Sequence, residues 1–180
     1  MVPILLLLAL TPVDAEPEPP GPERPYAEVV AGLEARRQDF GTRWHQPGIK
    51  RTSLRDEARS TVLDAITRQL MPAWYGTPWE FYGHSQTPGT GSIACGYFVS
   101  TVLRDAGFRI ERVRMAQQPA EHIVKTLAPG LTTWRFRDRP VSEVIDSPAM
   151  VSRYHVVGKL LEDGMMDAWM KGRALPTFIP

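Results

Sequence analysis

The chain has 180 residues, of which 43% are hydrophobic and 23% charged, a composition typical of a globular protein and not of an intrinsically disordered one. Its 21 Lys and Arg against 20 Asp and Glu leave a net charge of +1, so no overall basic field exists to bind DNA or RNA, and we expect no nucleic-acid partner. One Cys excludes an internal disulfide, and four His without a paired short spacing argue against a metal site. We expect no cofactor.

The N-terminal residues 1–15 are predicted to be a signal peptide. Their apolar run, Ile4 to Leu10, is followed by Val13-Asp14-Ala15, which has the small-x-small spacing of a signal-peptidase site. The run is far shorter than the ~20 residues needed to span a bilayer. We therefore expect a secreted or periplasmic protein with no membrane span after cleavage. Residues 16–25 hold five prolines and are predicted to form an extended spacer outside the fold.

Two helices are predicted next. The first covers residues 26–40 and ends at Gly41, and the second opens with Ser53 as a cap and Asp56 in its first turn and stops at Pro72. The apolar positions of the second helix recur at helical spacing, at Leu54, Ala58, Val62, Ala65, Ile66 and Leu70. A basic cluster is interpreted as a solvated face or, alternatively, as a contact with a cell wall or membrane surface, and it comprises Arg43, Lys50, Arg51 and Arg55.

A long surface loop is predicted over residues 74–91, where aromatic residues stand among Gly, Pro, Ser and Thr. Its aromatic residues are candidates for stacking on sugar rings or peptides, with core packing the alternative for half of them: Trp74, Trp79, Phe81 and Tyr82. The remaining pattern predicts helices over 95–106 (ended by Gly107) and 119–127, and strands over 108–113, 134–136 and 151–160. Together these elements predict an α+β fold.

Cys95 falls in the first turn of the predicted helix over residues 95–106. At a helix N-terminus, unpaired backbone amides and the macrodipole stabilise a thiolate, which makes it a better nucleophile. The alternative is a small buried hydrophobe, since Cys95 shares a helical stripe with Phe98, Val99 and Val102. The predicted export favours chemistry, because an unpaired thiol is a liability in an oxidising compartment.

The segment from Gly76 to Gln118 resembles the core of the NlpC-type cell-wall peptidases, which belong to the papain-like cysteine hydrolases. The resemblance is carried by GTPW at residues 76–79, Tyr82-Gly83, the Gly/Pro loop and IACGYFVSTVLRDAGF at residues 93–108, with Arg112 and Gln117-Gln118 after it. It covers about a quarter of the chain. It implies a papain-like domain over residues 53–180, preceded by a helix and linker over 26–52, with the nucleophile helix packed on a small antiparallel sheet.

The resemblance also implies the site. Cys95 matches the nucleophile, and His155, in a Tyr-His-Val-Val-Gly context, is the nearest match to the family's base. Its alternative is a strand histidine on the less apolar face. His84 is a second candidate base if the aromatic loop folds over the helix start, whereas His45 and His122 are expected to face solvent.

The chain departs from the family's pattern at three positions beside the nucleophile. Ala94 stands for an acidic residue, Gly96 for a serine, and Trp79 for the tyrosine that helps at the oxyanion. The oxyanion or substrate cleft is expected to involve Trp79, Tyr82 and Ala94. A tight hairpin predicted at Asp163-Gly164 would place Asp167 away from His155, so the residue that orients the base is unassigned.

The predicted function is that of an exported, monomeric cysteine hydrolase. A Cys95 thiolate would attack an amide carbonyl, with His155 as base and then acid, and the resemblance implies a peptide substrate in peptidoglycan stems. An alternative amide or thioester substrate stays open. So do a non-catalytic exported binding module on the same scaffold and a purely structural envelope component.

Overall fold

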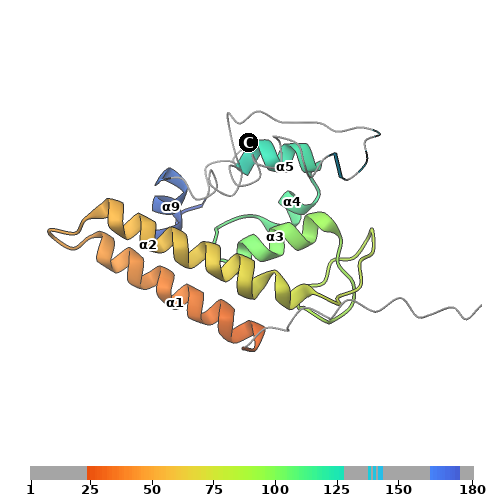
Figure 1. The fold of residues 1–180 in the computed structure, drawn as a ribbon, viewed down its shortest axis with the longest axis horizontal. Coiled ribbons are helices and arrows are strands. Elements are labelled where there is room, and N and C mark those ends of the chain that lie inside the picture. The colour runs from red at the N-terminus through yellow and green to blue at the C-terminus, as the bar shows by residue number, and fades with distance from the viewer. Residues whose placement is uncertain (1–23, 128–137, 139, 141, 144–162, 175–180) are drawn as a thin grey trace, which may run out of the picture.

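The computed structural model describes residues 24–127, 138, 140, 142, 143 and 163–174. Within these residues the regular elements are all helical and form a layered bundle (Figure 1). They are α1 (Tyr26–Trp44), α2 (Arg51–Asp64), the π-helix η1 (Ala65–Leu70), the 3₁₀ turn η2 (Pro72–Trp74), α3 (Cys95–Asp105), α4 (Arg112–Ala116), α5 (Ala120–Leu127) and α9 (Asp163–Met170).

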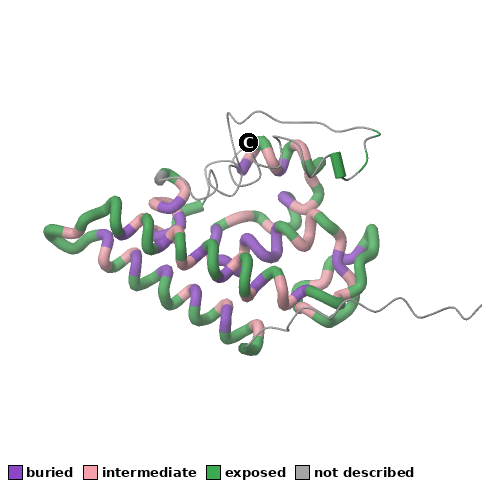
Figure 2. The backbone as a smooth tube through the Cα atoms, viewed as in Figure 1, coloured by how far each residue is buried: buried purple, intermediate pink, exposed green. Residues whose placement is uncertain are grey.

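The helices α1 and α2 lie side by side and antiparallel, and η1 continues the line of α2 (Figure 1). Each carries buried residues about one turn apart, as the purple bands in Figure 2 show. This spacing places one apolar stripe of each helix in the core, and Arg37 is the one charged residue of these two helices that is buried with it. The buried positions are Val29, Leu33, Arg37, Phe40 and Trp44 in α1, and Leu54, Ala58 and Val62 in α2.

The short helix α9 closes one end of this pair and contacts both α1 and α2. Trp169 is 1% exposed and donates from its indole Nε1 to the carbonyl of Ala106, at 2.7 Å. On the outer side of α9, Asp167 forms an ion pair with Arg55 of α2, with 2.7 Å between Oδ1 and Nε. Hydrophobic burial and a partly shielded ion pair thus both fix α9 against the bundle.

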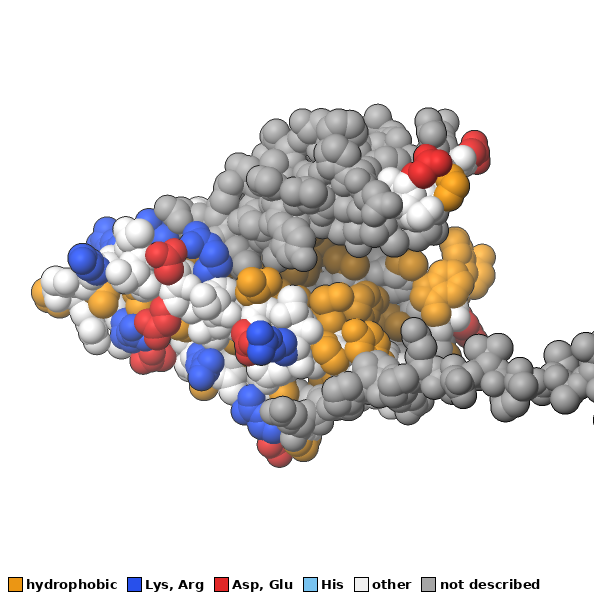
Figure 3. All heavy atoms as spheres, viewed as in Figure 1, with side chains coloured by type: hydrophobic (Ala, Val, Ile, Leu, Met, Phe, Trp, Pro, Cys, Tyr) orange, Lys and Arg blue, Asp and Glu red, His pale blue; other side chains and the backbone are white. Residues whose placement is uncertain are grey.

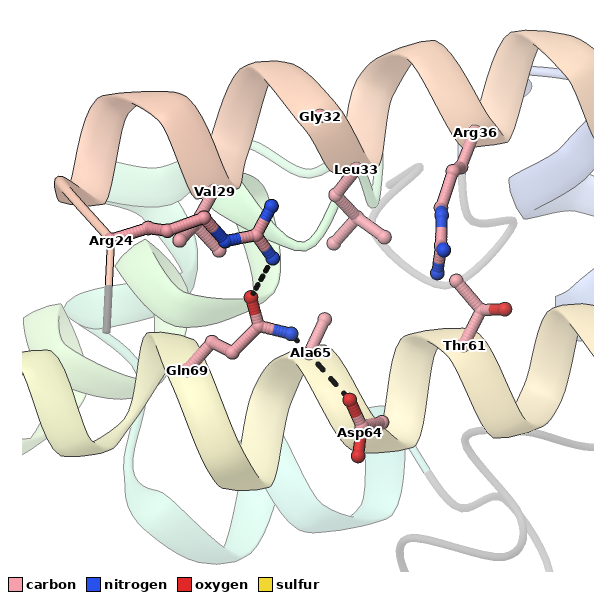
Figure 4. A pocket seen from close by; sticks show the side chains of 9 residues that line it. All are labelled: Arg24, Val29, Gly32, Leu33, Arg36, Thr61, Asp64, Ala65 and Gln69. Carbon is pink, nitrogen blue, oxygen red and sulfur yellow. Dashed lines mark hydrogen bonds between the residues drawn. The ribbon is translucent and has the colours of Figure 1, made fainter. Parts of the chain in front are cut away.

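A shallow pocket of about 240 Å³ lies between α1 and the helix formed by α2 and η1. Figure 4 shows Arg24 reaching across it to Gln69, whose side-chain oxygen accepts a hydrogen bond of 2.8 Å. The last residues of the predicted spacer are therefore in contact with the fold, although residues 1–23 lie outside the described part.

The predicted α+β fold is wrong for the described residues. They contain no strand, and β pairing is limited to three isolated bridges, at Trp79–Ile93, His84–Ile93 and Arg109–Ala174. Helix α3, which carries the predicted nucleophile, packs on α4 and η1 instead of on a sheet. The strands predicted over 134–136 and 151–160 lie outside the described residues, but the one predicted over 108–113 is replaced by a single bridge and the start of α4.

Other local predictions are corrected or confirmed. Gly41 does not end the first helix, which runs on to Trp44. A Cβ at Gly41 would lie 2.6 Å from the carbonyl oxygen of Met170, so this glycine permits the close approach of α9. The second helix begins at Arg51, with Lys50 at the N-cap and no side-chain cap, instead of at Ser53. The hairpin predicted at Asp163-Gly164 is the first turn of α9.

The predicted helices over 95–106 and 119–127 are confirmed as α3 and α5 within a residue at each end. Gly107 ends α3 with φ +90°, the left-handed conformation expected of a glycine stop. Helix α3 therefore has Cys95 in its first turn, and after Gly107 the chain enters the core at Phe108, which is 2% exposed.

Candidate functional site

Cys95 is the first residue of α3 and is exposed to solvent. The preceding residue, Ala94, is in an extended conformation with φ −90° and ψ 158°, and its carbonyl accepts the first helical hydrogen bond, from Phe98. This geometry directs the unpaired amides of the first turn toward the end of the helix where the thiol lies. The alternative of a buried structural cysteine does not hold for Cys95.

The indole of Trp79 donates a hydrogen bond to the thiol, with 3.2 Å between Nε1 and Sγ. An indole N–H can only donate, so the sulfur is the acceptor in this pair. A donor at this position stabilises negative charge on the sulfur and, after attack, on a nearby carbonyl oxygen. The resemblance predicts a tyrosine hydroxyl at this point of the sequence, and the donor here is an indole N–H instead.

The loop that carries Trp79 is held to the start of α3 by backbone hydrogen bonds. The amide of Ile93 donates to the carbonyl of Pro78 at 2.9 Å, and the amide of Ala94 donates to the carbonyl of Gly83 at 2.9 Å. A Cβ at Gly83 would lie 2.5 Å from the amide nitrogen of Ile93, so a side chain there would push the two segments apart. The loop is thus ordered by its own backbone pairing, and Trp79 with it.

Arg112 in α4 ties the other side of this loop to α3. Its guanidinium donates to the carbonyls of His84 and Ser85, at 3.0 and 2.6 Å, and to the hydroxyl of Thr101, at 2.7 Å. The same group lies over the ring of Tyr97, 4.7 Å from its centroid. Burial of the guanidinium lowers the pKa of Arg112 from its ordinary value. The arginine that forms part of the resemblance therefore has a structural task here, which is to hold the loop.

The residue after the nucleophile has a steric reason to be glycine. A Cβ at Gly96 would collide with the carbonyl oxygen of Ala116, because the end of α4 packs directly against the first turn of α3. The family's serine does not fit this backbone, so this departure reflects the packing of α4.

An apolar groove of about 300 Å³ opens beside the thiol. Figure 3 shows hydrophobic side chains gathered on this face, over the end of the helix formed by α2 and η1 and the loop after it. The described residues that line the groove are Met71, Trp74, Tyr75, Thr77, Trp79, Ile93, Cys95, Phe98 and Val99. Sulfur and donor thus lie at the edge of a concave apolar surface, as in many small-molecule sites.

The other predicted site residues are placed differently. His84 is exposed; its Nδ1 lies 3.2 Å from the carbonyl oxygen of Tyr82, and its ring centroid is 6.4 Å from that of Tyr97. None of the interactions among the described residues joins His84 to Cys95. The backbone N–H of Ala94 is already bonded to Gly83, which leaves the first-turn amides of α3 as the backbone donors for an oxyanion. His155 lies outside the described residues.

Tyr82 lies away from the groove. It is 86% exposed and packs edge-on against Phe81, which is 73% exposed, with 5.0 Å between the ring centroids. Of the loop's aromatic residues only Trp74 is buried, so core packing explains fewer of them than the sequence suggested. As expected, His45 and His122 are exposed.

Comparisons of the chain with protein-family models, with curated proteins and with solved structures find no match. The residues that the structure describes include no cluster of three or more His, Cys, Asp or Glu that could hold a metal ion. None of the helices in this part of the chain has the length and apolarity needed to cross a bilayer.

Sequence reasoning missed most of the groove. Met71 and Thr77 lie on the segments that flank the η2 turn, and Ile93 follows the glycine loop. Their spacing in the sequence carries no period, because they come from turns and not from one helix face. The aromatic composition of the segment was the one available signal.

Proposed function

We propose that the chain is an exported cysteine hydrolase that cleaves an amide bond through a thioester intermediate on Cys95. The observation that carries the proposal is the exposed thiol at the first turn of α3, bonded by the indole N–H of Trp79 at the edge of an apolar groove. Nucleophile, electrostatic stabiliser and binding surface then lie together, which is the arrangement that acyl transfer requires.

In the proposed reaction, the base takes the proton of the Cys95 thiol, the sulfur forms a bond to the amide carbonyl carbon, and the π electron pair of the C=O bond moves to oxygen. Collapse of this tetrahedral species breaks the C–N bond, and the amine leaves with a proton delivered by the base acting as acid. Water then attacks the thioester and releases a carboxylic acid and the thiol. Trp79 and the first-turn amides stabilise the oxyanion in both steps.

His155 is the proposed base, on the strength of the family resemblance. A hydrogen-bond donor such as Trp79 cannot take a proton, so a separate acceptor is necessary for thiol deprotonation. His84 is the second candidate. When its Nδ1 carries the proton shared with the carbonyl of Tyr82, its Nε2 is the unprotonated ring nitrogen. The proposed substrate is a peptide of peptidoglycan stems, met by a monomer in the periplasm or outside the cell.

The test is hydrolysis of purified peptidoglycan fragments, followed by mass spectrometry of the new amine and acid termini. Wild type is expected to release products, and Cys95→Ala none. His155→Ala is expected to lower the rate at least about 100-fold, with His84→Ala within a few-fold of wild type. The reverse result for the two histidines would assign the base to His84. Equal cleavage by wild type and Cys95→Ala, or none by either, would overturn the proposal.

A non-catalytic binding module is the second candidate, and the exposed pair Phe81 and Tyr82 favours it. Two aromatic side chains that pack edge to face and are 73% and 86% exposed form a surface on which a sugar ring or peptide can stack. Co-sedimentation with cell-wall sacculi distinguishes this function. Binding that survives Cys95→Ala and is lost in Phe81→Ser with Tyr82→Ser, without any product release by wild type, would support the binding module over the hydrolase.

A further inference from the structure

The lining of the groove beside Cys95 differs in charge from the rest of the described surface. The described residues that line it carry no ionisable carboxylate, ammonium or guanidinium group. The pocket between α1 and η1, in contrast, is lined by Arg24, Arg36 and Asp64. A carboxylate entering the groove beside Cys95 would lose hydration without meeting a cation among these residues, which costs several kcal/mol in an apolar site. Away from the edge formed by Trp79 and the first turn of α3, the described lining therefore favours uncharged groups over carboxylates.

The floor of the groove is made apolar by a hydrogen bond on its far side. Trp74 is 5% exposed, and its Nε1 donates to the hydroxyl of Tyr26 at 3.3 Å. Its one polar atom is thus engaged with α1. The ring of Phe98 meets the Trp74 ring edge-on, with 6.2 Å between centroids, so the two aromatic residues form a packed surface.

Helix α3, which carries Cys95, forms one side of the groove. Val99 lies one turn after Cys95 on α3, and both residues line the groove. A group that occupies the groove is therefore held next to the sulfur. The volume of about 300 Å³ is at the small end of ligand sites, which suits one side chain or a short acyl chain more than a complete lipid.

We propose that the groove binds an uncharged, apolar side chain of the substrate next to the bond that Cys95 attacks. This inference rests on the proposed function, because the bond beside the groove is the one that Cys95 cleaves in that proposal. Within the proposed stem peptides, it assigns bonds that lie next to an uncharged aliphatic residue. An acidic residue in that position is excluded from the groove.

The test uses maleimides, which add to the thiol without a base residue or turnover. Cys95 is the single cysteine of the chain, so each modification reports on this site. The rate constants for N-hexylmaleimide and N-ethylmaleimide are measured and their ratio is divided by the same ratio for glutathione. Full burial of one methylene is equivalent to about a fourfold gain, so the four extra methylenes are expected to raise the normalised ratio at least tenfold.

Val99→Glu places a carboxylate in the groove and is expected to return the normalised ratio to about one. Both maleimides are measured on the same variant, so any effect of the new carboxylate on the thiol itself cancels in the ratio. Leu63→Glu is the matched surface control: Leu63 is 39% exposed, Val99 is 37% exposed, and Leu63 does not line the groove. Val99→Thr keeps the side-chain shape, and it should lower the ratio partially if Val99→Glu fails to fold.

A normalised ratio within twofold of one for wild type would overturn the assignment of the groove. An equal rate for a maleimide whose chain ends in a carboxylate would do the same. The two proposals fail separately. Chain-length selectivity without hydrolysis would reject the hydrolase and leave the apolar binding site, whereas hydrolysis without selectivity would reject the apolar binding site alone.

Discussion

Tyr26→Phe tests how the floor of the groove is supported. The hydroxyl of Tyr26 donates to Asp105 Oδ2 at 2.7 Å and accepts from Trp74 Nε1 at 3.3 Å, so it joins α1, η2 and the end of α3. Asp105 is 8% exposed and keeps one other partner, the Arg104 guanidinium, at 2.7 Å. The substitution removes the hydroxyl and keeps the ring, which packs edge-on against Trp74.

The magnitude follows from the partners left behind. A buried donor or acceptor that loses its partner costs about 1–3 kcal/mol. The 2.7 Å hydrogen bond from Tyr26 to the Asp105 carboxylate contributes most of this free energy, and the 3.3 Å hydrogen bond from Trp74 contributes less. We expect Tyr26→Phe to lower the free energy of unfolding by about 2 kcal/mol. Tyr82→Phe is the matched control, because its 86% exposed side chain predicts a change within about 0.5 kcal/mol.

The assay is urea denaturation of both variants and wild type between pH 7 and 11. Burial and the hydrogen bond to Asp105 raise the pKa of Tyr26 well above its ordinary value. The stabilisation from a raised pKa is fully present below the unfolded value of about 10 and is lost as pH rises toward the folded pKa. The difference between wild type and Tyr26→Phe should therefore narrow above about pH 10. A difference below 0.5 kcal/mol at pH 7, or one that widens above pH 10, would refute this reasoning.

Two further predictions concern backbone contact and acid stability. Gly96→Ala should destabilise the fold by about 1–3 kcal/mol, because the new Cβ would meet the carbonyl oxygen of Ala116. Gly32→Ala should stabilise the fold by about 0.5–1 kcal/mol, because no atom lies within 4 Å of the new Cβ. Melting temperatures equal to that of wild type would contradict both expectations. Hydrogen bonds from Arg37 lower the pKa of Glu34 to about 2. Because Glu34 is 38% exposed, Glu34→Gln should cost about 1 kcal/mol or less at pH 7, with the gap to wild type closing as pH falls from about 4.3 toward 2 in acid titrations of unfolding. A gap independent of pH would contradict the assigned pair.

The helices were predictable where local pattern and tertiary packing agree. The stripe from Leu54 to Leu70 and the left-handed stop at Gly107 each have a local cause, an apolar period or a positive φ, and both appear in the structure. Gly41 shows the limit. A glycine after an apolar period predicts a helix end, but the same residue is also required where another backbone approaches closely. Nothing in the sequence around Gly41 predicts that the backbone of Met170 packs against it.

The missing sheet has a similar cause. The run from Phe108 to Val113 begins with alternating apolar and polar residues, as a strand does. So short a pattern fits a strand, a buried turn or a helix segment equally well. Which of these structures the run adopts depends on the packing of α3 against α4, where the backbone of Gly96 lies close to that of Ala116. Likewise, the bond from Trp79 to Cys95 spans 16 residues and depends on backbone pairing within an irregular loop, which has no periodic signature.

The indole of Trp79, where the resemblance predicts a tyrosine, constrains the proposed mechanism. A phenol can donate and accept, whereas an indole N–H donates alone. Among the described residues, the hydrogen-bond partner of the Cys95 sulfur is this donor. It stabilises a thiolate once formed but cannot remove the proton, so in the proposed hydrolase Trp79→Phe and a substitution of the base should differ in their effects. Trp79→Phe should slow alkylation of Cys95 by iodoacetamide about tenfold, because the sulfur loses its hydrogen-bond donor. Loss of the base should slow the proposed hydrolysis without affecting this alkylation. An unchanged alkylation rate in Trp79→Phe would show that the indole does not stabilise charge on the sulfur.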